Sequence, residues 1–138
     1  MSIVQTQTTS FKKELYQAVH NLATDTLKIA LYTGNANLNA DTTVYTTANE
    51  VVASGYTAGG NTMTGVTISS ADYTAYVNFA NTAWTAAITA RCALIYNASQ
   101  GNKSIAVIDF GADKTSTTTF TITMPPNTST TALIRSSN

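Results

Sequence analysis

Side chains suited to acid–base or nucleophilic chemistry are few in this sequence. The only histidine is His20 and the only cysteine is Cys92, which excludes two-histidine metal sites and internal disulfides. No Gly-x-Ser-x-Gly nucleophile motif accompanies His20, and a catalytic triad also needs a carboxylate that orients the histidine. We therefore expect His20 to be a partly exposed helical residue. We expect Cys92 to be a buried structural thiol, because it lies in an apolar strand whose pleat turns Arg91 to the opposite face.

Paired carboxylates are a second possible source of chemistry, because glycoside hydrolysis needs two acids about 5–10 Å apart. The sequence has seven acids, at Glu14, Asp25, Asp41, Glu50, Asp72, Asp109 and Asp113. Asp109 and Asp113 flank Phe110-Gly111-Ala112 and are candidates to hold a hard cation together with backbone carbonyls. The alternative is an aspartate turn that closes a strand, which the lack of an EF-hand-like ligand series favours. We expect no catalytic, cofactor-binding or metal-binding residues and no enzymatic activity.

Glycine and asparagine motifs add little chemistry. The segment Gly55–Asn61 holds three glycines but neither Gly-x-Gly-x-x-Gly nor Gly-Lys-Ser/Thr, so it predicts a sharp turn or bulge rather than a phosphate site. Asn97, Asn102 and Asn127 begin N-glycosylation patterns that chance explains in a chain rich in threonine, serine and asparagine. The seven tyrosines suit either a carbohydrate-binding face or, more commonly, cores and interfaces.

Composition narrows the class of protein. The 138 residues correspond to one domain, and only 10% are charged, with seven basic and seven acidic residues. Without a basic excess we expect neither nucleic acid nor a membrane as a partner. The 27 threonines suit strands, and a neutral polar surface is typical of particles, adhesins and assemblies, although a threonine-rich all-β domain alone would also explain it.

Targeting signals are not apparent. The first seven residues have no basic start and no apolar stretch of a signal peptide, and the longest apolar run, around Cys92–Tyr96, is too short to span a bilayer. We therefore expect the chain to stay in the cytoplasm in which it is made. A virion protein released by lysis would combine this lack of an export signal with the particle-like composition.

Hydrophobic periodicity predicts a mainly β fold with one N-terminal helix. We expect an extended arm over 1–9, a single all-β domain over 10–135, and a loose tail over 136–138. Within the domain a helix is predicted over 10–23, with Ser10 as N-cap. Its apolar stripe consists of Phe11, Leu15, Ala18, Val19 and Leu22.

Turn signals recur every 8–12 residues, which indicates an antiparallel β-sandwich, jelly-roll-like, of about seven to nine short strands. A hairpin loop is expected over 98–102, and Trp84 is expected in a turn as a core anchor. The expected strands cover 27–32, 63–69, 73–81, 88–97, 103–110, 117–124 and 130–135, with weaker candidates at 44–46 and 50–53.

Six blocks follow one another over nearly the whole chain. They are Ser10-Phe11-Lys12-Lys13-Glu14-Leu15, Thr26-Leu27-Lys28-Ile29-Ala30-Leu31-Tyr32-Thr33, Gly55-Tyr56-Thr57-Ala58-Gly59-Gly60, Ala93-Leu94-Ile95-Tyr96-Asn97, Asp109-Phe110-Gly111 and Ala132-Leu133-Ile134-Arg135. In this order the blocks resemble a family of small tailed-bacteriophage virion proteins, which implies a protein made in the host bacterial cytoplasm. Cys92 departs from the family pattern, in which a small residue such as glycine is expected.

The resemblance implies a structural protein on the outer surface of the virion head, which decorates and cements the capsid shell. Its implied partners are the major capsid protein and itself, as a homodimer or homotrimer. The alternative is a tail- or head-fibre-associated virion protein that binds host glycans. As contact elements we predict first the Met1–Thr9 arm, added as a strand to a neighbour's sheet edge, with a frayed terminus as the alternative. The long Gly34–Asn61 stretch is the second.

Overall fold

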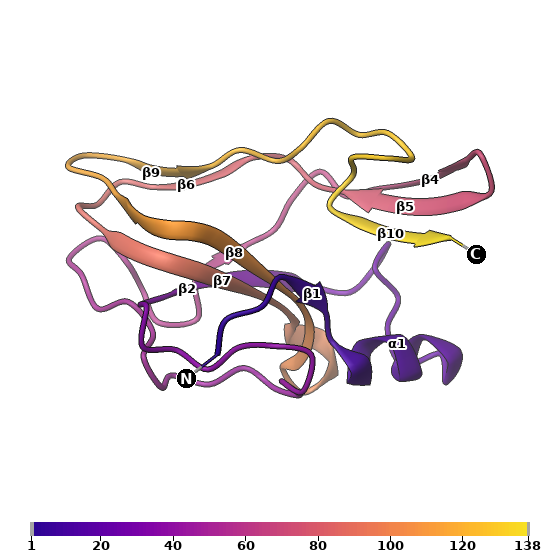
Figure 1. Cartoon of the computed structure of the whole chain (residues 1–138), viewed down its shortest axis with the longest axis horizontal. Coiled ribbons are helices and arrows are strands. Elements are labelled where there is room, and N and C mark those ends of the chain that lie inside the picture. Colours follow the sequence, from indigo (N-terminus) through magenta and orange to yellow (C-terminus); the bar gives the residue numbers. More distant parts are fainter. Residues whose placement is uncertain (1, 138) are drawn as a thin grey trace.

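The computed structural model describes residues 2–137, so Met1 of the predicted arm and Asn138 of the predicted tail lie outside the described residues. Within this range ten antiparallel strands form three sheets beside one α-helix, which confirms the predicted mainly β sandwich (Figure 1). The elements are β1 (Thr6–Gln7), α1 (Thr9–Tyr16), β2 (Leu27–Tyr32), β3 (Asn61–Thr62), β4 (Thr67–Ala71), β5 (Thr74–Asn78), β6 (Thr82–Trp84), β7 (Thr89–Asn97), η1 (Ala98–Gln100), β8 (Lys103–Thr115), β9 (Phe120–Ile122) and β10 (Ile134–Ser137).

The largest sheet has five strands in the order β1-β8-β7-β2-β3. Strands β7 and β8 form the expected hairpin, which turns through the short 3-10 helix η1 and the left-handed Gly101. Strand β2 was predicted to be half-buried, but all of its residues except Lys28 are buried. The prediction of a half-buried strand was wrong because both faces of this sheet are covered. The strands of the two smaller sheets cover one face, and loops cover the other.

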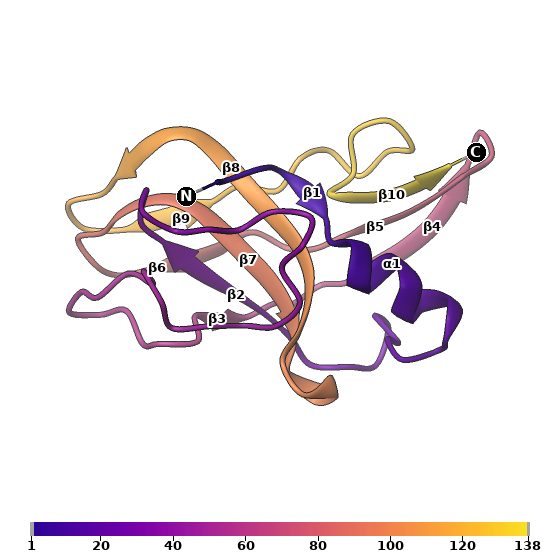
Figure 2. The same ribbon diagram turned by 60° about the horizontal axis from the view of Figure 1, so that its bottom comes forward.

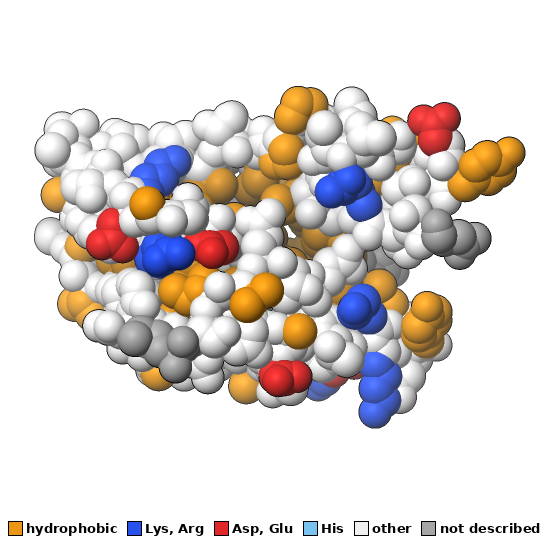
Figure 3. Space-filling view, viewed as in Figure 1, with side chains coloured by type: hydrophobic (Ala, Val, Ile, Leu, Met, Phe, Trp, Pro, Cys, Tyr) orange, Lys and Arg blue, Asp and Glu red, His pale blue; other side chains and the backbone are white. Residues whose placement is uncertain are grey.

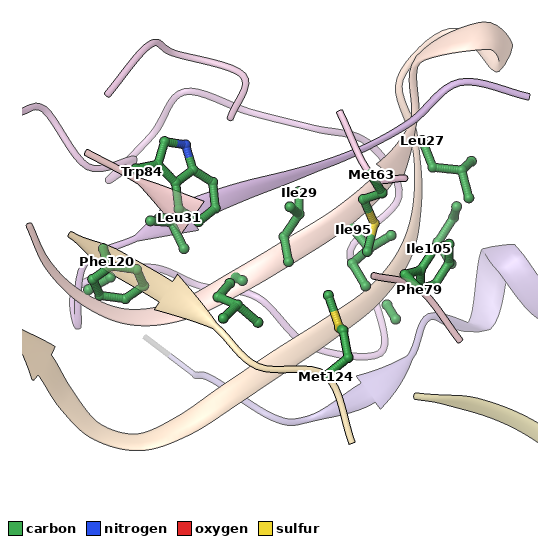
Figure 4. Packing of buried hydrophobic residues seen from close by; sticks show 14 of the residues in the cluster. Leu27, Ile29, Leu31, Met63, Phe79, Trp84, Ile95, Ile105, Phe120 and Met124 are labelled. Carbon is green, nitrogen blue, oxygen red and sulfur yellow. The ribbon is translucent and has the colours of Figure 1, made fainter. Parts of the chain in front are cut away.

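A second layer covers one face of this sheet. The β6–β9 pair and the β10–β5–β4 sheet lie above it in Figure 1, and the main core fills the space between. Figure 4 shows this core, in which Leu31 of β2 belongs to the same cluster as Trp84 and Phe120. The Trp84 and Phe120 rings lie 6.1 Å apart. Trp84 is the core anchor that the sequence predicts, but it ends strand β6 rather than occupying a turn.

The opposite face is covered by the N-terminal segment and the long loop after β2. A second core cluster there includes Tyr32, Leu38 and Leu94. The predicted arm is part of the domain: β1 pairs with β8, with Thr6 opposite Val107, and Ile3 forms a parallel bridge to Leu38. The arm therefore occupies an edge of its own sheet.

The predicted helix over 10–23 was too long, and its N-cap was misplaced. Helix α1 begins after Thr8, whose hydroxyl accepts a hydrogen bond from the Phe11 amide, and it is followed by Gln17 and by Ala18 in the left-handed region. The apolar stripe misled the prediction because Leu22 reaches the core from a loop, whereas Leu15 is 41% exposed.

The loose tail predicted over 136–138 is corrected as well. Ser136 and Ser137 belong to strand β10 and pair with Ala75 and Thr74 of β5. Strand β8 runs to Thr115, five residues beyond its predicted end. The remaining strong strand predictions agree with β4, β5, β7, β9 and β10 to within a few residues, whereas the segments at 44–46 and 50–53 form only isolated bridges.

Candidate functional site

The long loop between β2 and β3 is held by one buried carboxylate. Glu50 is only 6% exposed. Its Oε1 accepts a hydrogen bond from the Tyr45 hydroxyl at 2.6 Å, and its Oε2 accepts from the Tyr56 hydroxyl at 2.6 Å and the Gly59 amide at 2.8 Å. The Tyr96 hydroxyl donates to the Gly59 carbonyl at 2.6 Å. We call these five residues the Glu50 network.

The Glu50 network joins the loop to the main sheet. The Tyr56 hydroxyl accepts from the Leu31 amide of β2 at 2.9 Å, and the Tyr45 ring stacks on Tyr96 of β7 with centroids 4.6 Å apart. Burial raises the pKa of Tyr96 to about 12, with the Glu50 charge adding to the effect. Burial, followed by the hydrogen bond to Glu50, also raises the pKa of Tyr45 and Tyr56. The three tyrosines are therefore protonated donors that fix the loop.

The turn that completes this loop depends on glycine. Gly59 and Gly60 both have positive φ, at 100° and 78°. A Cβ atom on Gly60 would lie 1.8 Å from the Ile29 carbonyl oxygen, closer than any side chain permits. The sharp turn predicted for Gly55–Asn61 is thus confirmed, and its reason is the close approach of the loop backbone to β2.

The outer side of the loop presents a surface almost without charge. Val52 is 98% exposed and Val44 is 47% exposed. Asp41 is the one charged residue among the exposed positions of residues 34–60. We call these positions the loop surface: Gly34, Asn35, Asn37, Asp41, Thr43, Val44, Thr46, Thr47, Ala48, Asn49, Val52, Ser54, Gly55, Thr57 and Ala58.

His20 is not the partly exposed helical residue that the sequence suggests. It lies in the loop after α1, is buried, and bonds to Glu14 Oε1 through Nε2 at 2.9 Å and to the Asn97 amide nitrogen through Nδ1 at 3.0 Å. Asn97 also donates to Asp25, and its carbonyl oxygen accepts from the Ser99 amide. These bonds make Nδ1 an acceptor and Nε2 the donor. His20 therefore joins α1 to the end of β7, and the buried Asn97 is not a surface glycosylation site.

Asp25 completes this junction. Hydrogen bonds from the Asn21 backbone and from the Asn97 side chain lower the pKa of its carboxyl group. The same bonds close the turn that replaces the predicted second half of the helix.

The remaining sequence candidates lie on β7 and β8. Cys92 is buried, as predicted, and burial together with nearby Asp109 raises the pKa of its thiol to about 12. Asp109 accepts from Arg91 at 3.2 Å and from the Gly111 amide at 2.8 Å. The predicted aspartate turn that closes a strand was wrong, because Asp109 and Asp113 both lie inside β8, which continues to Thr115. Among residues 2–137, no three His, Cys, Asp or Glu side chains are grouped so that they could hold a metal ion.

Glu50 is the residue that sequence reasoning missed. The available signal was a lone acid in a neutral stretch, with tyrosines five residues before it and six after it.

Across the described part of the chain, no helix is long and apolar enough to cross a membrane. No protein-family model, curated protein or solved structure matches this chain.

Proposed function

We propose that this chain is a structural virion protein of a tailed bacteriophage, which decorates and stabilises the capsid shell by binding the major capsid protein through its loop surface. The observation that carries the proposal is a nearly uncharged loop surface held rigidly on a buried carboxylate. The resemblance of the sequence blocks to small phage virion proteins supports the same class.

The loop surface is suited to lasting protein contact. Hydroxyl and amide groups cost less to remove from water than charged groups, and the exposed loop positions carry only Asp41 as a charge. The Glu50 network orders the loop before binding, so less conformational entropy is lost when a partner docks. Val44 and Val52 add apolar area that is exposed in the free chain.

The loop is a better contact element than the N-terminal arm. Backbone bonds tie residues 2–9 to their own domain, including Val4 to Leu38 and Thr8 to Ile105. Using the arm as a strand on a neighbour would require breaking these bonds first. The loop surface needs no such rearrangement.

The test is co-sedimentation of the purified chain with expanded heads that lack it. Saturable binding near one copy per shell subunit is expected. Val52→Lys should weaken binding at least about tenfold, because an unpaired ammonium would be buried at the contact. The matched control is Thr118→Lys, which places the same charge at an exposed position between β8 and β9 and should change binding less than about twofold.

Two outcomes would contradict the proposal. One is a folded wild-type chain that does not bind heads; binding to purified tails or host glycans would then favour the tail- or fibre-associated alternative. The other is head binding that Val52→Lys and Thr118→Lys weaken equally, which would exclude the loop surface as the contact.

A further inference from the structure

Residues of α1 and of the β10–β5–β4 sheet line a groove. These elements lie at the end of the molecule away from the loop over residues 50–60 (Figures 1 and 2). The volume of the groove is about 780 Å³. Apolar side chains from both walls line it: Phe11, Leu15 and Tyr16 from α1, and Ile68, Val77 and Ile134 from the sheet.

Apolar groups are also exposed around this groove. Tyr73, at the tip of the β4–β5 hairpin, is 99% exposed, Tyr16 is 93% exposed, and Ile68 and Leu15 are 53% and 41% exposed. We call these four residues the apolar end. Figure 3 shows hydrophobic side chains at the hairpin tip and over α1, with basic side chains to the left of them. Large apolar side chains exposed at one end of a soluble protein are typical of an interaction site.

The hairpin itself is built as a projecting element. Every residue of its edge strand β4 is exposed, so β4 lacks the covered face that normally stabilises a strand. Asp72 and Tyr73 both have positive φ, at 52° and 64°, a two-residue turn that favours glycine or asparagine. The turn therefore holds both residues in strained backbone conformations, and it places an aromatic ring at the tip of the hairpin.

The charges of the tip and the groove are opposite. The groove is lined by Lys12 and Arg135, both exposed, and its lining residues include no carboxylate. The tip carries Asp72 directly beside Tyr73. An occupant with one aromatic ring and one adjacent carboxylate would complement the apolar walls and the basic side chains of the groove. This chain itself supplies such a ring and carboxylate in Tyr73 and Asp72.

We propose that the groove binds the Asp72–Tyr73 tip of a second copy of this chain. Tyr73 packs against the exposed Leu15 and Tyr16 of the other copy, while Asp72 faces Lys12 and Arg135. Because each copy offers both a tip and a groove, a two-fold pair makes the contact twice. The inference concerns a different surface from head binding and does not depend on it.

The exposed area is sufficient for such a pair. A tyrosine buries about 150–250 Å², so Tyr16 and Tyr73 together contribute about 400 Å² from each copy. Two copies give about 800 Å² from these rings alone. Ile68, Leu15 and the groove walls raise the total past the roughly 1,000 Å² that a specific interface requires.

The first test measures the mass of the full chain by sedimentation over a range of concentrations. A pair is expected for the wild-type chain, and Tyr73→Ser should raise its dissociation constant at least about tenfold. The matched control is Val52→Ser, an equally exposed residue on the loop surface, which should pair like the wild type.

The second test reverses the charges. Asp72→Lys alone and Lys12→Glu with Arg135→Glu should each lose pairing, because like charges meet at both contacts. Mixing the two variants should restore pairing, since a lysine tip then meets an acidic groove and an aspartate tip meets a basic one. Thermal unfolding checks that each variant is folded.

Three results would overturn the inference. They are a wild-type chain that stays monomeric at about 0.1 mM, a pair that Tyr73→Ser leaves unchanged, and charge variants that are folded but do not associate on mixing. The Val52→Lys variant separates the two proposals, because it should lose head binding and keep pairing.

Discussion

Replacing Glu50 with alanine should destabilise the fold more than any other acid-to-alanine change in the loop. The Tyr56 hydroxyl and the Gly59 amide would lose their buried acceptor, at about 1–3 kcal/mol each. Tyr45 is only partly buried, so its hydroxyl can turn to water. Relief from burying a charge offsets part of the loss. We expect a net cost of about 3 kcal/mol, which for a chain of this length lowers Tm by about 10 °C.

The assay is thermal and urea unfolding followed by circular dichroism. Asp41→Ala removes an exposed carboxylate from the same loop and should change stability by less than about 0.5 kcal/mol. Glu50→Gln should cost roughly half as much as Glu50→Ala, because the amide oxygen can still accept from Tyr56 and Gly59 while its NH2 donates to Tyr45. A loss below about 1 kcal/mol for Glu50→Ala, or an equal loss for Asp41→Ala, would refute the structural role.

Three further outcomes are expected. Gly60→Ala should prevent soluble expression or lower Tm sharply, because its Cβ would meet the Ile29 carbonyl oxygen at 1.8 Å, whereas Gly101→Ala, with its nearest neighbour at 3.8 Å, should cost only about 1 kcal/mol. Cys92 should resist a thiol reagent at pH 8 until the protein is unfolded in urea, since its thiol is buried and its pKa is raised to about 12. Stability should fall as the pH rises from about 9 towards 12, because the folded chain keeps protons on Cys92 and the buried tyrosines that the unfolded chain releases; a rise in Tm over that range would contradict the sign.

Strands with strong local patterns were predictable, and features set by distant contacts were not. β7 is apolar over most of its length, so its position follows from sequence alone. The end of α1 does not, because Leu22 and His20 reach the interior from a loop that Asn97 holds, 77 residues from His20. The helical spacing of Leu22 relative to the apolar residues of α1 therefore does not reflect a continuous helix.

The candidate site illustrates the same limit. The weak secondary-structure signals of the long loop predict a contact element, and this role stays a prediction. The organising residue of the loop was missed, because Tyr96 joins the Glu50 network from β7, far along the chain. The full exposure of β4 could not be predicted from the sequence either, because an alternating pattern of side chains does not show whether another layer covers the strand. Both features depend on which elements meet in the folded chain.

Pairing through the apolar end would change how the chain binds a head. The β4–β5 hairpin and the loop over residues 50–60 lie at opposite ends of the molecule in both ribbon views (Figures 1 and 2), so a tip-in-groove pair leaves the part of each loop surface over residues 50–60 free. A second contact made by an already tethered partner gains from effective concentration and strengthens binding by about 10²-fold or more.

Tyr73→Ser should therefore weaken head binding by about 10²-fold although Tyr73 belongs to neither the loop surface nor the Glu50 network. The loss should appear as faster dissociation, because each single contact is unchanged. The charge-reversed variants provide the control: each alone should bind heads as weakly as Tyr73→Ser, and their mixture should bind as tightly as the wild type. Full-strength head binding by a monomeric Tyr73→Ser chain would show that a single loop surface suffices and that pairing contributes nothing to decoration.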